Sequence, residues 1–217
     1  MIKRKAWLAM LAMATVILGG CDSYSLLDQF ALHGGLRITP QSSTLRPGES
    51  SPLYLEGGTA PYSLYSVNGG LYDDSTAFDL GTLDDVGPAY SYTAGDSIGP
   101  VTIRLGDSLG FSTSATITVV PHAPTLVNAD GFYGGPSEIQ ITWNYPYADK
   151  IAGFTILRSK SGAAFTTLVG AESLPKSQTS FIDTGASPST MNIYRVYAFA
   201  GQHLSGYGES GSIGNPP

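Results

Sequence analysis

The chain has 217 residues and a formal net charge of −6 at pH 7, and this acidic balance argues against nucleic acid as a partner. Glycine and proline are abundant, at 27 and 14 residues, while 42% of the residues are hydrophobic and 13% are charged. This composition is typical of an ordered chain built from short elements and many turns. The length is sufficient for two small domains.

The first 21 residues have the layout of an export signal. Residues 3–5 are Lys-Arg-Lys, residues 6–18 are almost entirely apolar, and two glycines precede Cys21, the single cysteine. The apolar run is shorter than the roughly 20 residues of a membrane-spanning helix. This layout resembles the lipobox of bacterial lipoproteins. The resemblance implies a signal peptide at 1–20, a lipid on Cys21, a tether at 21–35 and an exported protein anchored to the periplasmic or surface face of a bacterial cell membrane.

A single cysteine excludes an intramolecular disulfide, so each exported domain must be held together by its apolar core. Two alternatives to lipidation stay open: a buried thiol, and cleavage at an ordinary signal site, because Gly19 stands where lipoproteins more often have alanine or serine. Asp22 resembles the inner-membrane retention signal of enterobacterial lipoproteins. That rule varies between phyla, so inner and outer membrane both stay open.

The segment 36–120 consists of short runs in which apolar residues recur at every second position, with turn residues between them. This period predicts strands that each bury one face, and no run has the period of a helix. The predicted strands are 36–38, 53–55, 62–65, 101–105 and 115–119. Together they indicate an antiparallel β-sandwich. The sequences Ile-Thr-Pro at 38–40, Arg-Pro-Gly at 46–48 and Gly-Gly-Thr-Ala-Pro-Tyr-Ser at 57–63 resemble a bacterial immunoglobulin-like repeat.

Residues 106–110, Gly-Asp-Ser-Leu-Gly, match the G-x-S-x-G pattern of a serine hydrolase. In that elbow a helix follows the serine, so that its N-terminus helps to stabilise the oxyanion. Here a β-type run, 111–120, follows Ser108, and a near copy of the pentapeptide lies at 95–99. The two copies are therefore interpreted as turns that flank the strand 100–105, and no catalytic residue is expected.

Five aspartates form the one candidate metal site of the chain, a weak one for Ca²⁺. A loop that carries several carboxylates supplies the oxygen ligands that calcium prefers, but the spacing here fits no EF-hand. The residues are Asp73, Asp74, Asp79, Asp84 and Asp85, within the loop-like stretch 69–85. Solvated loop carboxylates are the simpler interpretation, and no cofactor is expected.

Residues 121–124, Pro-His-Ala-Pro, predict a boundary between two domains, because prolines stiffen the connection and cannot donate to a sheet. Beyond it the alternating pattern predicts further strands at 138–143, 154–159, 165–168, 180–184 and 194–198. The order of Trp143-Asn144, Gly-Phe-x-Ile-Leu-Arg at 153–158 and Tyr-Arg-Val-Tyr-Ala at 194–198 resembles a fibronectin type III domain. The expected fold is therefore all-β: two tandem antiparallel β-sandwiches, immunoglobulin-like at 36–120 and fibronectin type III-like at 121–217.

The fibronectin type III resemblance has one departure and one firm expectation. Asn192 stands where the family usually has the tyrosine that fastens a corner of the sandwich, so this corner should be secured in another way. Trp143 continues the alternation of Ile139 and Ile141, which places its side chain in the second core.

Aromatic residues in two loops form a candidate binding site. By the family topology, the loop after Trp143 and the loop 201–208 emerge at the same end of the sandwich. Aromatic rings on such loops recur in carbohydrate and protein recognition. The candidates are Tyr145, Tyr147, His203 and Tyr207. The simpler interpretation is that these side chains cover the end of the core.

The leading functional hypothesis is a non-enzymatic, lipid-anchored cell-envelope protein that acts as a spacer and interaction module. Its partners would be the membrane, through the lipid on Cys21, and an envelope protein or glycan. The alternative is a glycan-binding lipoprotein of a polysaccharide system that uses the loop aromatics. An enzyme ranks third, because His33, His122 and His203 have no metal-ligand or triad spacing.

Replacing the single cysteine tests the anchor. Cys21→Ser should abolish incorporation of a fatty-acid analogue in growing cells, because the thiol that accepts the lipid is gone. Gel fluorescence after metabolic labelling measures this, with Ser23→Ala as the matched control that keeps its label. Equal labelling of the wild type and Cys21→Ser would contradict the anchor.

Overall fold

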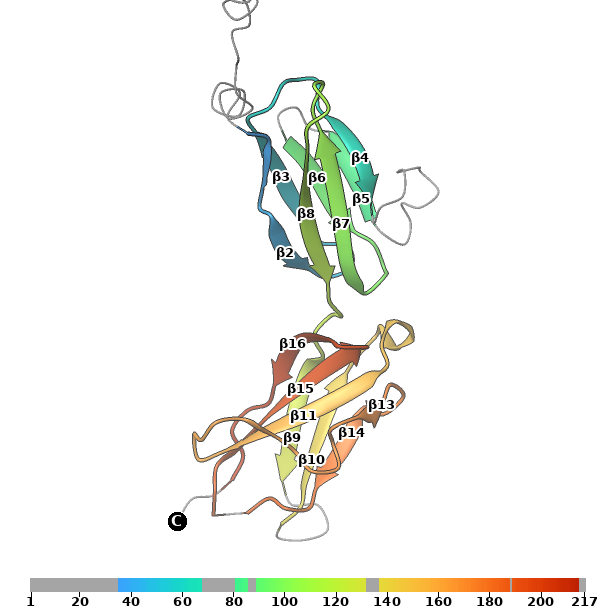
Figure 1. The fold of residues 1–217 in the computed structure, drawn as a ribbon. Helices are drawn as coiled ribbons and strands as arrows, with labels where there is room; N and C mark the ends of the chain where they lie inside the picture. Colours follow the sequence, from blue (N-terminus) through green and yellow to red (C-terminus); the bar gives the residue numbers. More distant parts are fainter. Residues whose placement is uncertain (1–34, 68–80, 86–88, 132–136, 188, 215–217) are drawn as a thin grey trace, which may run out of the picture.

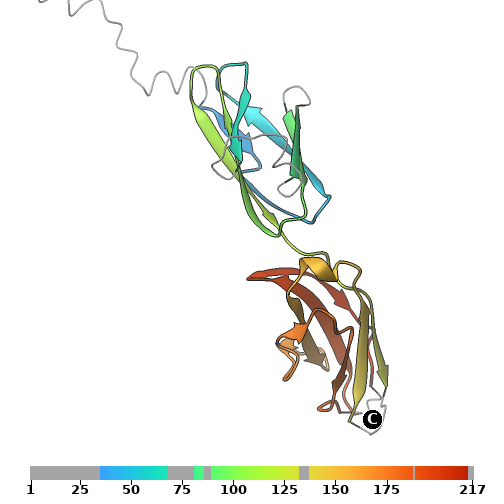
Figure 2. The ribbon, with the colours of Figure 1, turned by 90° about the vertical axis from the view of Figure 1, so that its right-hand side faces the viewer.

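A computed structural model describes residues 35–67, 81–85, 89–131, 137–187 and 189–214. These residues form two β-sandwiches that follow one another along the chain and lie end to end (Figures 1 and 2). The predicted all-β fold is confirmed, and the one helical element in the described part is a short 3₁₀ turn, η1 (Ala148–Lys150). No helix in these ranges is long and apolar enough to cross a membrane. Cys21 lies outside the described residues.

The first sandwich consists of two four-stranded sheets. One has the order β1 (Arg37–Thr39), β3 (Ser50–Glu56), β6 (Ala89–Ala94), β5 (Gly81–Asp85). The other has the order β2 (Ser42–Leu45), β8 (Ser112–Val119), β7 (Gly99–Gly106), β4 (Ser63–Val67). Each strand pair is antiparallel except β2 with β8, which is parallel and departs from the expected pattern. The exception arises because the chain passes from the first sheet to the second after β1. There β2 lies beside β8, the last strand of this sandwich.

The core of the first sandwich comes from alternate residues of these strands. In β7, residues 101, 103 and 105 are buried while 102 and 104 are exposed, and β8 alternates in the same way. The five strands predicted in this segment are all present, whereas β2, β5 and β6 were not predicted. The side chains of Leu53, Ile103 and Ile117 are completely buried, which is the outcome of period-two patterning over two facing sheets.

The aspartate-rich stretch needs a correction. Asp84 and Asp85 were expected in a loop, but they end β5 and pair with Ser91 and Tyr90 of β6. Their backbone is extended because β6 offers a free edge to which β5 adds. Asp73, Asp74 and Asp79 lie outside the described residues.

The second sandwich has a three-stranded and a larger sheet. The first has the order β14 (Ser180–Asp183), β10 (Ile139–Asn144), β9 (Thr125–Gly131). The second has the order β12 (Thr166–Thr167), β11 (Gly153–Lys160), β15 (Asn192–Ala200), β16 (His203–Glu209), and β13 (Leu174–Pro175) also pairs with β11. All these strand pairs are antiparallel.

Trp143 lies in the core of the second sandwich, as predicted. Its side chain is 5% exposed, and its ring centroid lies 5.3 Å from that of Phe154 on the facing sheet, in an edge-to-face arrangement. Ile139 and Ile141 are completely buried on the same face of β10. The Trp143 Nε1 has no hydrogen-bond partner among the described residues, so this side chain stabilises the domain by packing.

The corner at Asn192 is secured without the family tyrosine. The buried Asn192 side chain donates from Nδ2 to the carbonyl oxygen of Thr190 at 2.9 Å and to that of Ser187 at 3.4 Å. Its backbone exchanges two hydrogen bonds with Ile213, of 2.7 and 2.9 Å. An amide thus replaces the phenol and fixes the entry to β15.

The segment 201–208 was expected to be a loop, but most of it is strand β16. The alternating apolar pattern of a strand is missing here because the inward side chain is the polar Ser205. Its Oγ accepts a 2.9 Å hydrogen bond from the Ala198 N–H, at the point where the pairing of β16 with β15 is irregular. A Cβ at Gly208 would collide with the carbonyl group of Pro124 and with Val127. The glycine is therefore required by the close passage of the neighbouring chain.

Residues 120–124 connect β8 to β9, at the junction of the two sandwiches (Figure 1). Pro121 and Pro124 are both buried there. Across the junction, the Lys150 Nζ lies 3.2 Å from the Asp96 Oδ2. Each sandwich has its own cluster of buried apolar residues, and independent folding of residues 122–217 stays a prediction.

Removing the central tryptophan should test the second core. Trp143→Ala should lower the free energy of unfolding of this sandwich by about 3–5 kcal/mol, because it leaves a large cavity between the sheets. Tyr147→Ala is the control: Tyr147 is 44% exposed, and its loss should cost no more than about 1 kcal/mol. Chemical denaturation followed by circular dichroism measures both. A neutral Trp143→Ala would refute the packing described here.

Candidate functional site

Two of the four candidate aromatic residues lie side by side after β10. Tyr145 is 7% exposed, and its ring centroid lies 5.2 Å from that of the core residue Phe154. Tyr147 is 44% exposed, meets Tyr145 edge to face at 6.0 Å, and stacks on His122 of the connecting segment at 4.2 Å. Tyr145 thus belongs to the end of the core, while Tyr147 is accessible at the junction.

The other two candidates lie on β16 and are separated from each other. His203, at the start of the strand, faces the first sandwich, since a Cβ on Gly99 would lie 3.9 Å from its Nε2. Tyr207 lies farther along, opposite Tyr197, with the Arg195 guanidinium 4.0 Å from its ring centroid. Alternate residues of β15 are buried, so Arg195 and Tyr197 lie on the outer face of the sheet. The structure therefore does not gather the four candidates into one surface.

A pocket of about 470 Å³ lies at the junction. Both sandwiches and the connecting segment contribute to it. The lining residues are Pro47, Gly48, Asp96, Ile98, Pro121, His122, Tyr145, Tyr147, Asp149 and Lys150. We call it the junction pocket. Its walls are largely aromatic and apolar, with a few charged groups, which is the usual composition of a small-molecule site.

The charged groups of the junction pocket pair with one another. The Lys150 Nζ lies 3.2 Å from the Asp96 Oδ2 and 3.6 Å from the Asp149 Oδ2. The hydrogen bond to Asp96, and then the charges of both carboxylates, raise the pKa of Lys150. Burial, and secondarily Tyr147 and Asp149, raise the pKa of Tyr145 to about 12, and its hydroxyl has no hydrogen-bond partner among the described residues. At neutral pH the Lys150 side chain is thus an ammonium, and the Tyr145 side chain is a neutral phenol.

Sequence reasoning found only the two tyrosines of this pocket. Asp96, Ile98 and His122 were missed because they lie in a turn of the first sandwich and in the connecting segment. No local pattern relates such residues to a loop that comes much later in the chain. The one sequence feature that could have indicated this pocket is His122, which lies between the two boundary prolines.

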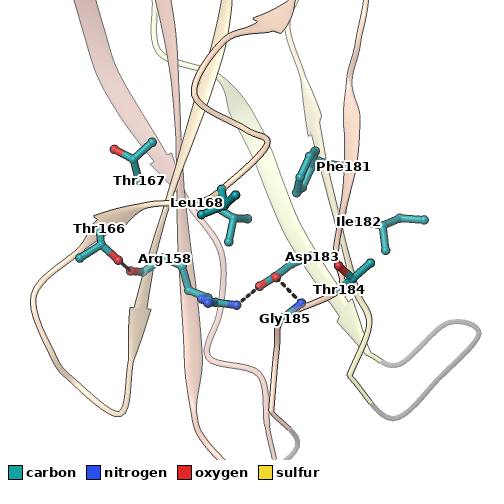
Figure 3. Close-up of a pocket in the computed structure, with 10 residues that line it drawn as sticks. Arg158, Thr166, Thr167, Leu168, Phe181, Ile182, Asp183, Thr184 and Gly185 are labelled. Carbon is teal, nitrogen blue, oxygen red and sulfur yellow. Dashed lines mark hydrogen bonds and ion pairs between the residues drawn. The ribbon is translucent and has the colours of Figure 1, made fainter.

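A second pocket, of about 390 Å³, lies between the edge strands β12 and β14 of the second sandwich (Figure 3). Its rim carries the exposed apolar residues Val169 and Ile182 and several threonines. Arg158 reaches across from β11 towards Asp183 at the end of β14 (Figure 3). This second pocket therefore combines an apolar rim with a charged pair.

The charged pair in this second pocket serves the structure. The Asp183 carboxylate is 3% exposed and accepts hydrogen bonds from Arg158 Nη1, from the Tyr194 hydroxyl at 2.8 Å and from the Gly185 N–H at 2.9 Å. Burial and the bond to Asp183 raise the pKa of Tyr194. A carboxylate with three donors has little capacity left for a ligand, so this network fastens the two sheets.

Ser108 lies in a turn between β7 and β8, as predicted. Its Oγ donates to the carbonyl oxygens of Thr59 and Ala60, at 3.1 and 3.2 Å. The preceding Asp107 orders the turn by accepting hydrogen bonds from the N–H groups of Leu109 and Phe111. No helix follows the serine, and the described histidines, His122 and His203, lie at the junction, the other end of this sandwich (Figure 1). The elbow geometry of a hydrolase is absent here.

Within the described ranges, no group of three or more histidine, cysteine, aspartate or glutamate residues could hold a metal ion.

No protein-family model matches this chain, and no curated protein matches it. Among solved structures, a segment of two fibronectin type III domains from chicken tenascin is 11% identical, with a TM-score of 0.51 over 83% of this chain and 97% of the segment. Domains A168–A170 of titin are 15% identical, with a TM-score of 0.38 over 83% of this chain. The match spans 64% of that titin structure. The likeness to the tenascin segment shows the fold, two β-sandwiches of the fibronectin type III or immunoglobulin-like kind.

Two arginine–carboxylate pairs in the second sandwich allow a matched test of the buried network. Asp183→Ala should destabilise the protein by about 3–5 kcal/mol, because it leaves the Arg158 charge without its partner in a largely buried place. Glu209→Ala removes the partner of Arg195 on the outer face, and should cost much less than Asp183→Ala because that pair is partly exposed to solvent. Denaturant midpoints measure the difference. Equal losses of stability for the two variants would show that the Asp183 network does not hold the two sheets together.

Proposed function

We propose that this protein is a lipid-anchored cell-envelope protein whose two β-sandwiches act as a spacer and as an interaction module. The lipid on Cys21 attaches it to a bacterial membrane, and residues 21–35 form the tether to the first sandwich. Its biological partner is an envelope protein or a glycan. It is not an enzyme: fibronectin type III and immunoglobulin-like domains are typically non-catalytic, and Ser108 has only a turn-forming role.

One observation carries this proposal: the two sandwiches are arranged end to end and not side by side (Figure 2). Such an arrangement extends the chain away from an anchor near its N-terminus. The buried Pro121 and Pro124 and the ion pair between Asp96 and Lys150 restrain the junction. The distal sandwich is then presented at a distance from the membrane.

Glycan binding is a second candidate function, and the junction pocket favours it. Tyr145 and Tyr147 line this pocket with His122, and aromatic walls with nearby carboxylates suit the mixed apolar and hydroxylated surface of a sugar. The site proposed for it is smaller than the sequence suggested, since His203 and Tyr207 do not line the pocket.

Anchored presentation can be tested by photo-crosslinking in cells. A photoreactive amino acid at Val169 of the second sandwich, a residue that is 87% exposed, should give a defined crosslinked product. The same probe in the Cys21→Ser protein should give at least about tenfold less product, because the released protein no longer presents that sandwich at the membrane. Tyr54 of the first sandwich, 50% exposed, is the comparison position. Products that do not depend on Cys21 would refute the anchored role.

A further inference from the structure

Residues of both sandwiches line the junction pocket. A ligand bound there therefore contacts both sandwiches at once. We propose that it binds a single neutral sugar ring, and that the bound ring holds the two sandwiches in the arrangement of Figure 1. This inference rests on the glycan-binding candidate and specifies where the sugar binds, which charge it has and what binding does to the chain.

The size and the walls of the pocket suit one ring. A volume of about 470 Å³ lies at the lower end of the range of small-ligand sites, about 300–1,000 Å³. Ile98, Pro47 and Pro121 supply aliphatic surface, and the stacked rings of His122 and Tyr147 supply aromatic surface. The carbon-bound hydrogens of a pyranose pack against such surfaces, while its hydroxyl groups need polar partners.

The charges of the pocket select a neutral ring. Asp96 and Asp149 accept hydrogen bonds, and sugar hydroxyl groups can donate to them without a change in charge. The one ammonium, on Lys150, is already paired with both carboxylates. Among the described residues that line the pocket, an anionic sugar would meet two carboxylates and no unpaired lysine or arginine. A cationic sugar would have to compete with Lys150 for its partners.

The position of the pocket couples binding to the angle between the sandwiches. Asp96 and Ile98 come from the turn before β7, whereas Tyr147 and Lys150 come from the segment after β10. A ligand that touches both groups binds well only when the sandwiches are aligned, so it stabilises that alignment. Residues of the first sandwich should therefore matter as much for affinity as the tyrosines of the second.

The test uses the full mature chain with Cys21→Ser, which needs no lipid. Glucose, galactose and N-acetylglucosamine are titrated as neutral rings, with glucuronate and glucosamine as charged counterparts, and protein NMR signals are followed. At least one neutral ring should shift the signals of both Ile98 and Tyr147. Glucuronate and glucosamine should bind about tenfold more weakly or worse. The absence of a shift with all three neutral rings, or equal binding of a charged ring, overturns the proposal.

Two variants and two matched controls then locate the site. Tyr147→Ala and Asp96→Asn should each weaken binding about tenfold, as expected for the loss of one well-placed contact. Tyr207→Ala, whose 46% exposure matches the 44% of Tyr147, and Glu56→Gln on β3 should leave affinity unchanged. If Tyr207→Ala abolished binding and Tyr147→Ala did not, glycan binding would stand and the junction site would be wrong. If Asp96→Asn had no effect, the claim that both sandwiches hold the ring would be refuted.

Discussion

Each sandwich has to be held together by apolar side chains from two facing sheets, because the single cysteine, Cys21, cannot form a disulfide within the chain. Everything else depends on this packing. Ile103 and Ile117 in the first sandwich, and Ile141, Phe154 and Val196 in the second, are completely buried. The resulting two cores are rigid supports, and the segments that leave them at the junction are the ones that can carry a binding site.

Buried polar groups determine how the ends of these cores are closed. Asp107 accepts hydrogen bonds from three backbone N–H groups, those of Thr59, Leu109 and Phe111, at one end of the first sandwich. Asp183 has a comparable structural role in the second sandwich, where it accepts hydrogen bonds from Arg158 and Tyr194 of the opposite sheet. In both places the carboxylate is nearly inaccessible and fully engaged. These carboxylates therefore serve the fold, whereas the charged side chains that line the junction pocket are partly exposed.

The junction between the two sandwiches matters for both proposed functions. Both proposed roles depend on it: a spacer needs restrained sandwiches, and the sugar site needs walls from both of them. The ion pair between Asp96 and Lys150 is exposed to solvent, and pairs of this kind contribute little to stability. Such a contact biases the angle between the sandwiches without locking it. In the proposed role, a sugar ring bound in the junction pocket therefore needs only a modest binding energy to hold that angle.

The sequence by itself determined the all-β class and most of the strands, because period-two alternation directly records which side of a strand faces a core. It did so for β7, β10, β11 and β15, and it placed Trp143 correctly. It failed at β16, where Ser205 points inward and Gly208 makes room for a neighbouring chain, since neither requirement leaves an apolar pattern. Only the tertiary structure decided that Tyr147 meets His122, and that Tyr207 lies elsewhere. The physical reason is that local periodicity reports burial, whereas proximity between distant residues depends on how strands pair and how the two sandwiches stack.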